Sequence, residues 1–329
     1  MYRESNTWAL VLAAGEGTRL RSLTTTNTGA SVPKQFCSLR GGLSLFHEAL
    51  QRAHSLATRS RTCAIVARQH WIWWQGLPRG LPISNVIVQP RNRGTANGIL
   101  LPLLHIVERD PLAQILILPS DHHVREERVL QHSLECALQQ LRRAPADIIL
   151  LGFKPYEPDP DLGYILPIPD EDAETLQVRR FVEKPSSSEA EGIIELGGLW
   201  NAFIIAATAQ SLLTLFRRQR AQLVDQMHAA VLQDLNEPEA NATEHLYQRL
   251  PTLDFSRDIL EGQEQSLRVL TVPNCGWSDL GTPSRVEKVL RHSVSISVAQ
   301  MEHLDWSYLS LAAQLARRGD KLKPGQPKS

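Results

Sequence analysis

A glycine turn near the start of the chain carries the first residues that could do chemistry. It reads Ala13-Ala14-Gly15-Glu16-Gly17-Thr18-Arg19 and follows an apolar stretch. The N–H groups of such a turn can approach a polyphosphate closely, and Arg19 and Lys34 would balance its charge. The turn lacks the third glycine of the dinucleotide fingerprint, where Leu20 stands, and the Gly-Lys-Ser/Thr ending of a Walker A loop. It therefore predicts a phosphate site of another kind.

Two carboxylates stand where they could hold a magnesium ion. Asp121 follows the apolar segment 115–119, and Asp279 lies in "GWSDLG". Mg²⁺ prefers one or two carboxylates together with substrate oxygens. A carboxylate after a strand often only caps a helix, so this hypothesis depends on the two meeting. His122 and His123 do not predict zinc, because adjacent histidines point in different directions and no Cys-x-x-Cys completes a site.

A second polar group, in "FVEKP" and "LWNAF", suits a sugar phosphate. Glu183 and Asn201 can accept hydrogen bonds from vicinal hydroxyls, and the asparagine can also donate. Lys184 can meet a phosphate. Each segment alone is an ordinary strand end, so the interpretation depends on the segments lying together.

Alternating strand and helix patterns must position these residues. Helical spacing in 44–56 and 127–143 separates short apolar stretches that are typical of buried strands. The alternation predicts a parallel sheet covered by helices on both faces, and ligands of such a sheet collect beyond the carboxyl ends of its strands. Three polar motifs follow predicted strands, "VPKQF" comes about a dozen residues after the first of them, and four such motifs at one edge indicate a nucleotide pocket. The three are "AAGEGTRL", "QPRNRGTANG" and "PSDHHV". The predicted strands of this half are 8–14, 63–67, 85–90, 114–121 and 147–153.

The remaining elements are predicted in the same way. A helix is expected over 95–110, with Thr95 as a candidate N-cap and with Pro102 kinking or breaking it. Further strands are expected at 163–168, 176–185 and 266–273, and 207–250 should be mostly helical. Trp71, Trp73 and Trp74 are expected to pack a helix or loop rather than stack on a base.

Composition limits the classes of function. Lys plus Arg and Asp plus Glu are equal at 35 each among 329 residues, which argues against a general binder of nucleic acid or membrane surfaces. The four cysteines form no Cys-x-x-Cys pair, so reduced thiols in a cytosol are expected. No signal peptide or apolar run of about 20 residues is evident. We expect a cytoplasmic protein, and the sequence leaves a homo-oligomer open.

The order of these motifs resembles that of the sugar-1-phosphate nucleotidyltransferases, most closely the mannose-1-phosphate guanylyltransferases. The resemblance spans about residues 8–290, and each motif is modest whereas the ordered set is specific. It implies an α/β fold with a Rossmann-like, mostly parallel mixed sheet, helices on both faces and an inserted sugar-binding region. This is the nucleotide-diphospho-sugar transferase fold. The motifs are, in order, "LAAGEGTRL", "PKQF", "RGTANG", "LPSDH", "GYI", "EKP", "LWN" and "WSDLG".

The resemblance also implies an activity and a set of site residues. A nucleotidyl group would pass from an NTP, with GTP expected, to a sugar-1-phosphate, with mannose-1-phosphate expected, and pyrophosphate would leave. The catalytic cations would be Arg19, Lys34 and Lys184, with Mg²⁺ as cofactor on Asp121 and Asp279. The triphosphate would lie on Ala14, Gly15, Gly17, Thr18, Arg19 and Lys34, the base and ribose near Gln89, Pro90, Gly94 and Thr95, the sugar hydroxyls on Gly163, Glu183 and Asn201, and the sugar phosphate on Lys184.

The chain departs from the family pattern in several places. Ala replaces the first glycine of the turn, and a proline expected near Arg21-Ser22 is absent. The family's "RNTAPA" is Arg93-Gly94-Thr95-Ala96-Asn97-Gly98 here, its Gly-Tyr-Gly-Tyr-Ile is 161–165, "DLGYI", and its "WNSG" is 200–203, "WNAF". The phosphate and metal positions are kept, whereas the base and sugar surroundings change.

We expect one compound domain followed by a tail. The nucleotidyltransferase domain would span 1–292, with a nucleotide half over about 1–155 and a sugar half over about 156–292. The tail, 293–329, would hold an amphipathic helix over 301–318 and a disordered polar end.

Two other functions remain open. A cytidylyltransferase of a sugar or alcohol phosphate would share the glycine turn and Pro33-Lys34-Gln35, although "EKP", "WN" and "WSDLG" favour the sugar family. A non-catalytic protein that senses an NDP-sugar and regulates a partner would be supported by loss of Lys34 or a metal carboxylate, and both are retained.

Overall fold

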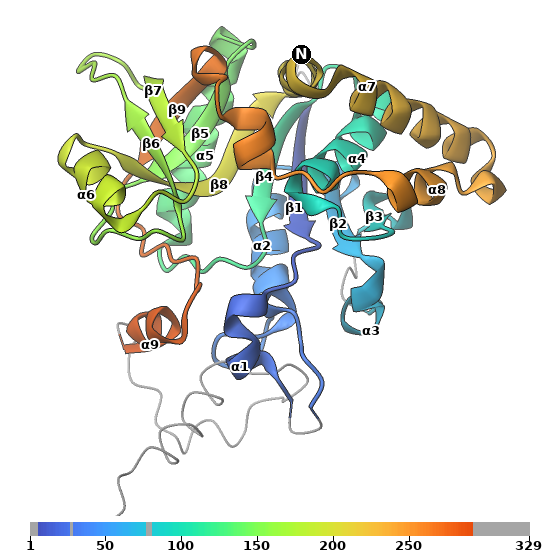
Figure 1. Cartoon of the computed structure of the whole chain (residues 1–329), viewed down its shortest axis with the longest axis horizontal. Helices are drawn as coiled ribbons and strands as arrows, with labels where there is room; N and C mark the ends of the chain where they lie inside the picture. Colours follow the sequence, from blue (N-terminus) through green and yellow to red (C-terminus); the bar gives the residue numbers. More distant parts are fainter. Residues whose placement is uncertain (1–5, 27–28, 77–80, 292–329) are drawn as a thin grey trace, which may run out of the picture.

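One mixed sheet organises the part of the chain that the computed structural model describes, residues 6–26, 29–76 and 81–291. Nine strands lie in the order β3-β2-β1-β4-β8-β5-β9-β7-β6, and β8 also pairs with β6. Figure 1 shows β2 and β3 at one end of the sheet and β6, β7 and β9 at the other. The strands are β1 Thr7–Ala13, β2 Thr62–Ala67, β3 Val86–Gln89, β4 Gln114–Pro119, β5 Ile148–Phe153, β6 Gly163–Pro167, β7 Leu176–Val182, β8 Leu199–Thr208 and β9 Leu267–Val272.

The first four strands are parallel to one another, as their apolar pattern predicts. β1 lies between β2 and β4, so chain connections leave it in opposite directions. Their carboxyl ends meet at one edge of the sheet. The ends of the paired strands β1 and β4 form a topological switch point, the kind of place where ligands bind in open α/β sheets. This arrangement brings the glycine turn after Ala13 close to the loop after Pro119.

The second half interleaves antiparallel strands. β8 runs antiparallel to both β4 and β5, while β9 returns parallel to β5. β6 and β7 then pair antiparallel at the end of the sheet. The sheet is therefore mixed, as the family resemblance implies, and its parallel pairs are concentrated in the first four strands.

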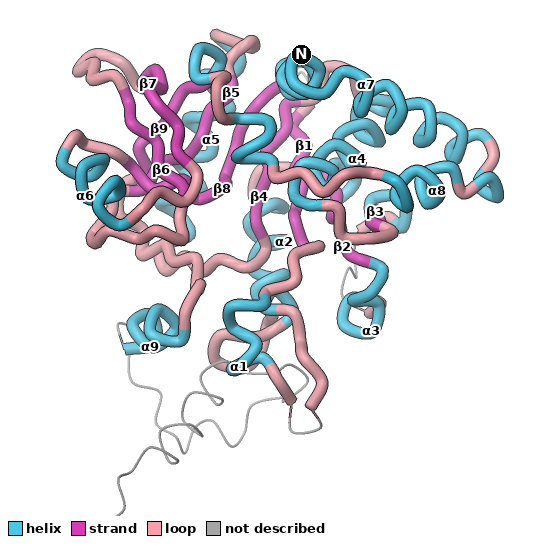
Figure 2. The backbone as a smooth tube through the Cα atoms, viewed as in Figure 1, coloured by secondary structure: helices cyan, strands magenta, loops and turns pink. Residues whose placement is uncertain are grey.

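Helices cover both faces of the sheet, because alternate strand residues point to opposite sides. Val11 enters a core with α2 and α5, whereas its neighbour Leu10 enters a second core with α4 and α7. Figures 1 and 2 show these layers. The helices are α1 Arg21–Thr24, α2 Leu45–His54, α3 Trp71–Trp74, α4 Gly94–Arg109, α5 Glu127–Arg143, α6 Ser187–Glu195, α7 Ala209–Asn236, α8 Ala242–Arg249 and α9 Pro283–Arg291.

Two expectations about α4 were wrong. The helix begins at Gly94 with Arg93 as its N-cap, so Thr95 is inside it. The Thr95 hydroxyl instead accepts a hydrogen bond from the Phe255 N–H at 2.7 Å. Pro102 does not break the helix, which continues to Arg109. Proline removes one backbone hydrogen bond, and burial of the apolar residues around it between sheet and α7 outweighs that loss.

The tryptophan cluster at 71–74 lies within the described residues, whereas the predicted tail does not. Trp74 is 6% exposed and donates its indole N–H to the Ala67 carbonyl at 2.7 Å, while Trp71 packs edge-on against it. The packing role expected for this cluster is therefore seen at Trp74. The predicted tail, 293–329, lies outside the described residues. No helix within the described ranges is long and apolar enough to cross a bilayer.

Candidate active site

The glycine turn is held in place by the segment that carries Lys34. Gly17 has a φ of 61°, and a Cβ there would lie 2.9 Å from the Lys34 backbone nitrogen, so only glycine fits. The Gln35 amide donates to the carbonyls of Ala13 and Gly15 at 3.0 and 2.9 Å. A Cβ on Gly15 would meet nothing within 4 Å. The turn therefore presents open backbone at Gly15 and a fixed shape behind it.

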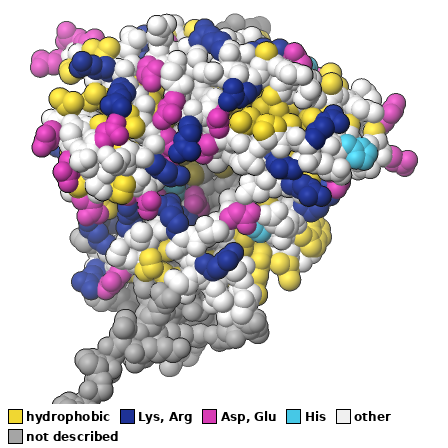
Figure 3. All heavy atoms as spheres, in the orientation of Figure 1, with side chains coloured by type: hydrophobic (Ala, Val, Ile, Leu, Met, Phe, Trp, Pro, Cys, Tyr) yellow, Lys and Arg dark blue, Asp and Glu magenta, His cyan; other side chains and the backbone are white. Residues whose placement is uncertain are grey.

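A cleft of about 560 Å³ lies over this turn at the carboxyl ends of the strands. It collects most of the predicted nucleotide residues together with Asp121, Lys184, Asp254 and Gly281, whereas Pro90 does not line it. Figure 3 shows basic and acidic side chains around the hollow on this face. A larger cleft of about 1590 Å³ contains Trp8, Arg109 and Arg218 and none of the predicted site residues. The predicted residues that line the smaller cleft are Ala14, Gly15, Gly17, Thr18, Arg19, Lys34, Gln89, Gly94, Thr95, Asp121 and Lys184.

Lys34 joins the two loops that carry the predicted metal ligands. Its ammonium is 2.9 Å from Asp121 Oδ2 and donates to the Asp279 backbone carbonyl at 2.5 Å, although only 4% of the residue is exposed. Burial alone would raise the pKa of Asp121, but Lys34, His122 and Arg19 outweigh it and lower the pKa to about 2. Burial lowers the pKa of His122 to about 4, so this imidazole is neutral at pH 7.

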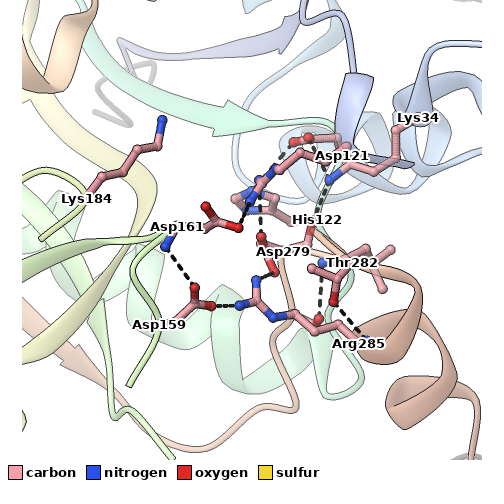
Figure 4. Close-up of polar contacts among 12 residues, drawn as sticks. Lys34, Asp121, His122, Asp159, Asp161, Lys184, Asp279, Thr282 and Arg285 are labelled. Atoms are coloured by element: carbon pink, nitrogen blue, oxygen red, sulfur yellow. Dashed lines mark hydrogen bonds and ion pairs between the residues drawn. The ribbon is translucent and has the colours of Figure 1, made fainter. Parts of the chain in front are cut away.

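The Asp279 carboxylate is bound by two arginines rather than by the Asp121 side. Arg285 reaches its Oδ1 at 2.7 Å and Arg19 its Oδ2 at 3.4 Å. Arg285 also contacts Asp159, and Arg19 lies 3.4 Å from Asp161. Figure 4 shows Arg285 between the carboxylates of Asp159 and Asp279.

The carboxylates fit a magnesium ion unequally. The Asp121 side chain is 37% exposed and lines the cleft, which suits one carboxylate plus substrate oxygens. Both oxygens of Asp279 face guanidinium groups, so Oδ2 becomes available only when Arg19 moves. Within the described ranges no group of three or more His, Cys, Asp or Glu side chains is arranged to hold a metal.

The predicted sugar residues lie together. Gly163 on β6 pairs with Asn201 on β8, and a Cβ at Gly163 would lie 2.7 Å from Glu183 Oε2. The Lys184 ammonium is 3.7 Å from Glu183 Oε1, and its backbone has a φ of 51°, which is rare for a residue with a side chain. Figure 4 places Lys184 on the opposite side of the site from Lys34.

Asp254 connects the predicted base and sugar residues. It accepts a hydrogen bond from Thr95 at 3.3 Å and, after burial, is the next cause of a raised pKa at Glu183. Gly94 has a φ of 82° and packs so closely on the 251–254 segment that a Cβ would lie 2.7 Å from the Leu253 carbonyl carbon. Its glycine is therefore needed for this packing. Gln89 is 2% exposed, and its Nε2 has no partner among the described residues.

Sequence reasoning missed five residues of this site: Gln35, Asp159, Asp161, Asp254 and Arg285. Gln35 and Asp161 had a signal, because the first lies in the "PKQF" motif and the second stands where the family pattern has glycine. The other three lie outside every motif. Only folding brings them to the site.

Comparisons with known proteins agree with this arrangement. A family model described as nucleotidyl transferase matches residues 8–294. The alginate biosynthesis protein AlgA of Pseudomonas syringae is 26% identical over 288 residues, which cover 85% of this chain and 57% of that protein. A mannose-1-phosphate guanylyltransferase of Escherichia coli is 25% identical, with 83% and 59% covered. The chain thus spans less than two thirds of the length of these relatives.

Solved structures show the same fold. A Thermus thermophilus protein described as a mannose-1-phosphate geranyltransferase superimposes with a TM-score of 0.73 at 28% identity, over 88% of this chain and 80% of its own. A putative glucose-1-phosphate thymidylyltransferase of Bacillus anthracis gives a TM-score of 0.54 at 13% identity, over 90% of this chain and 99% of its own, which is a likeness of fold alone. With its sheet, its glycine turn and the family match over nearly its whole length, this chain belongs to the nucleotidyl transferase family.

Proposed function

We propose that this protein transfers a nucleotidyl group from GTP to mannose-1-phosphate and releases pyrophosphate. One observation carries the reaction type: the buried Lys34 ammonium ties Asp121 and the Asp279 loop to the glycine turn, while Lys184 lines the same cleft from the other side. Two cations that face each other across one cleft suit two phosphate-bearing substrates.

The residues of the chain supply position and charge. A phosphate oxygen of the sugar phosphate attacks the α-phosphorus in line, the new P–O bond forms, and the bond to pyrophosphate breaks. The nucleophile is already an anion, so no protein base is required. Lys184 orients the attacking phosphate, and Lys34 and Arg19 neutralise charge around the α-phosphorus and the leaving group.

The proposed cofactor is Mg²⁺, which the carboxylates of Asp121 and Asp279 would hold. When bound, the ion adds positive charge where the leaving pyrophosphate develops negative charge. The carboxylate of Asp121 is ready for this role, because its pKa of about 2 keeps it ionised.

The choice of substrates is supported by the relatives. The Escherichia coli relative is named as a mannose-1-phosphate guanylyltransferase, which points to GTP and mannose-1-phosphate here. Glu183 Oε1 is 3.7 Å from the Lys184 ammonium, and Glu183 and Asn201 both lie against Gly163, which suits a site for sugar hydroxyls next to a phosphate. We place the reaction in the cytoplasm, which agrees with the four free cysteines Cys37, Cys63, Cys136 and Cys275.

A pyrophosphate-release assay with four NTPs and a panel of sugar-1-phosphates tests the proposal. We expect the highest kcat/KM with GTP and mannose-1-phosphate, and none without added Mg²⁺. Turnover with CTP or UTP and not with GTP would contradict the base and leave the reaction type intact. If no pair reacts while an NDP-sugar binds, the chain is a sensor and the proposed reaction is wrong.

A further inference from the structure

We propose that Arg285 is a positioning residue that fixes Asp279 by its Oδ1 and leaves Oδ2 to face Arg19, which lines the cleft. The inference rests on the proposed function, because it assigns Asp279 to the metal of that reaction. Arg285 lies in α9, outside every motif of the family resemblance. It does not line the nucleotide cleft, so it acts through Asp279.

The contacts of Arg285 form a bridge between two buried carboxylates. Its guanidinium meets Asp279 Oδ1 at 2.7 Å through Nη1 and contacts Asp159 through Nη2. The exposed fractions of the side chains are 12% for Arg285, 4% for Asp279 and 5% for Asp159. A planar guanidinium can serve two carboxylates in one fixed geometry, which an ammonium cannot. Figure 4 shows the bridge.

The far end of the bridge is itself fixed. Asp159 Oδ1 accepts a hydrogen bond from the Asp161 N–H at 2.9 Å, and the Asp159 N–H donates to the Tyr164 hydroxyl at 2.8 Å. The Trp200 indole donates to the same hydroxyl at 3.0 Å. Asp159 is therefore an anchor in the core of the sugar half, and Arg285 transmits its position to Asp279.

The near end is shaped to accept the guanidinium. A Cβ at Gly281 would lie 3.0 Å from both Arg285 Nη1 and Arg19 Nη1, so a side chain there would press on both arginines. Thr282 directly precedes α9 and caps its first turn: its hydroxyl accepts from the Arg285 N–H at 3.3 Å, and its carbonyl accepts from the Val286 N–H. The capped start of α9 at Thr282 and the space left by Gly281 together place the Arg285 guanidinium against Asp279.

The two arginines on Asp279 differ in how firmly they are held. Arg19 is 47% exposed at 3.4 Å and also contacts the half-exposed Asp161, whereas Arg285 is 12% exposed at 2.7 Å. Exposed ion pairs are weak and exchange readily, while a buried paired charge is costly to separate. An arriving triphosphate therefore draws Arg19 away and leaves Arg285 in place, which frees Oδ2 alone.

The first test measures the bridge without any ligand. Hydrogen–deuterium exchange of the peptide that covers 276–281 should become at least about tenfold faster in Arg285→Gln and should be restored in part by Arg285→Lys. Arg291→Gln is the matched control, because Arg291 lies on the same helix, is 75% exposed and pairs only with Glu287 among described residues. Unchanged exchange in a folded Arg285→Gln overturns the inference and leaves the proposed function untouched.

The second test measures metal binding without turnover. Mn²⁺ binding is followed by electron paramagnetic resonance with GTP present and sugar phosphate absent. We expect the dissociation constant to rise about tenfold in Arg285→Gln, the scale for loss of a residue that orients a metal ligand, and kcat to fall further than either KM rises. Tighter Mn²⁺ binding would mean that Arg285 competes with the metal, and equal binding would mean that it does not position Asp279. Either result overturns the inference.

A second variant covers a failure to fold. Asp159→Asn removes the anchor and keeps the contact between Arg285 and Asp279, so it should shift exchange and Mn²⁺ affinity in the same direction by a smaller factor. No shift in this folded variant would also overturn the inference. If wild-type protein binds no GTP while the exchange results hold, the proposed function fails and the bridge stands.

Discussion

The two walls of the cleft are built differently. On the nucleotide wall, Lys34 is 4% exposed and makes two short contacts, so its charge is placed before any ligand arrives. On the sugar wall, the Lys184 side chain is 51% exposed, its ammonium lies 3.7 Å from Glu183, and its backbone φ is 51°. Under the proposed reaction, the charge for the reacting phosphorus would be preorganised, whereas the sugar phosphate would be met by a residue held in place through its backbone.

The largest effect should follow from the nucleotide wall. Lys34→Ala should lower kcat/KM at least ~100-fold, the scale for loss of one group placed at developing charge. Pyrophosphate release measures it, and circular dichroism checks the fold. Lys154→Ala, at an exposed lysine, is the control and should react at the wild-type rate. A normal rate in Lys34→Ala would show that this lysine takes no part in the reaction. The proposed difference between the two sides of the cleft would then be wrong.

The carboxylates of the same wall come next. Asp121→Asn and Asp279→Asn should each raise the Mg²⁺ concentration for half-maximal rate by about 10- to 100-fold, since each removes a proposed metal ligand. Nucleotide binding without sugar phosphate should remain largely intact. Asp161→Asn is a matched control, because Asp161 also touches Arg19 but is not assigned to the metal. An unchanged Mg²⁺ dependence in both variants would show that the ion is held elsewhere.

Glu183 tests the sugar wall. Glu183→Gln should raise the KM for the sugar phosphate several-fold, on the order of one lost charged hydrogen bond, while the NTP KM stays fixed. An amide would place a donor against a sugar hydroxyl. Burial and Asp254 raise the pKa of Glu183, so in wild type the sugar KM should also rise as the pH falls toward that raised pKa. Loss of nucleotide affinity instead would put Glu183 on the wrong wall.

Sequence patterns predict the helices and strands better than they predict which strands pair with each other in the sheet. Each strand of the nucleotide half is an apolar stretch, and parallel strands with helices between them must share one carboxyl edge. The local sequence does not predict that β8 lies antiparallel between β4 and β5, because strand pairing depends on contacts between residues far apart in the chain.

The site divides in the same way. Glycine turns and strand-end carboxylates have motifs, so Gly17, Lys34 and Asp121 could be proposed from sequence. Arg285 has none, since its partners are a loop residue on one side and Asp159 on the other. Gly94 has a motif position and lines the cleft, and the structure adds a packing reason for glycine there, because it lies against Leu253.

The smallest effect separates the backbone of Lys184 from its charge. Both Lys184→Gly and Lys184→Ala remove the ammonium, so both should weaken use of the sugar phosphate equally. Their stabilities should differ, because alanine keeps the strain of a φ of 51° and glycine does not. We expect the free energy of unfolding to be about 1 kcal/mol higher for Lys184→Gly than for Lys184→Ala, or roughly 2 °C in Tm for a chain of this size.

Differential scanning calorimetry of the two variants, side by side, measures this difference. Equal Tm values would mean that the backbone at Lys184 relaxes without cost, and the sugar wall would then hold its lysine no more firmly than any exposed loop does. A higher Tm for the glycine variant with equal loss of activity would show that strain at Lys184 is kept for function. The two walls would then differ as inferred, with buried ion pairs placing one cation and a strained backbone placing the other.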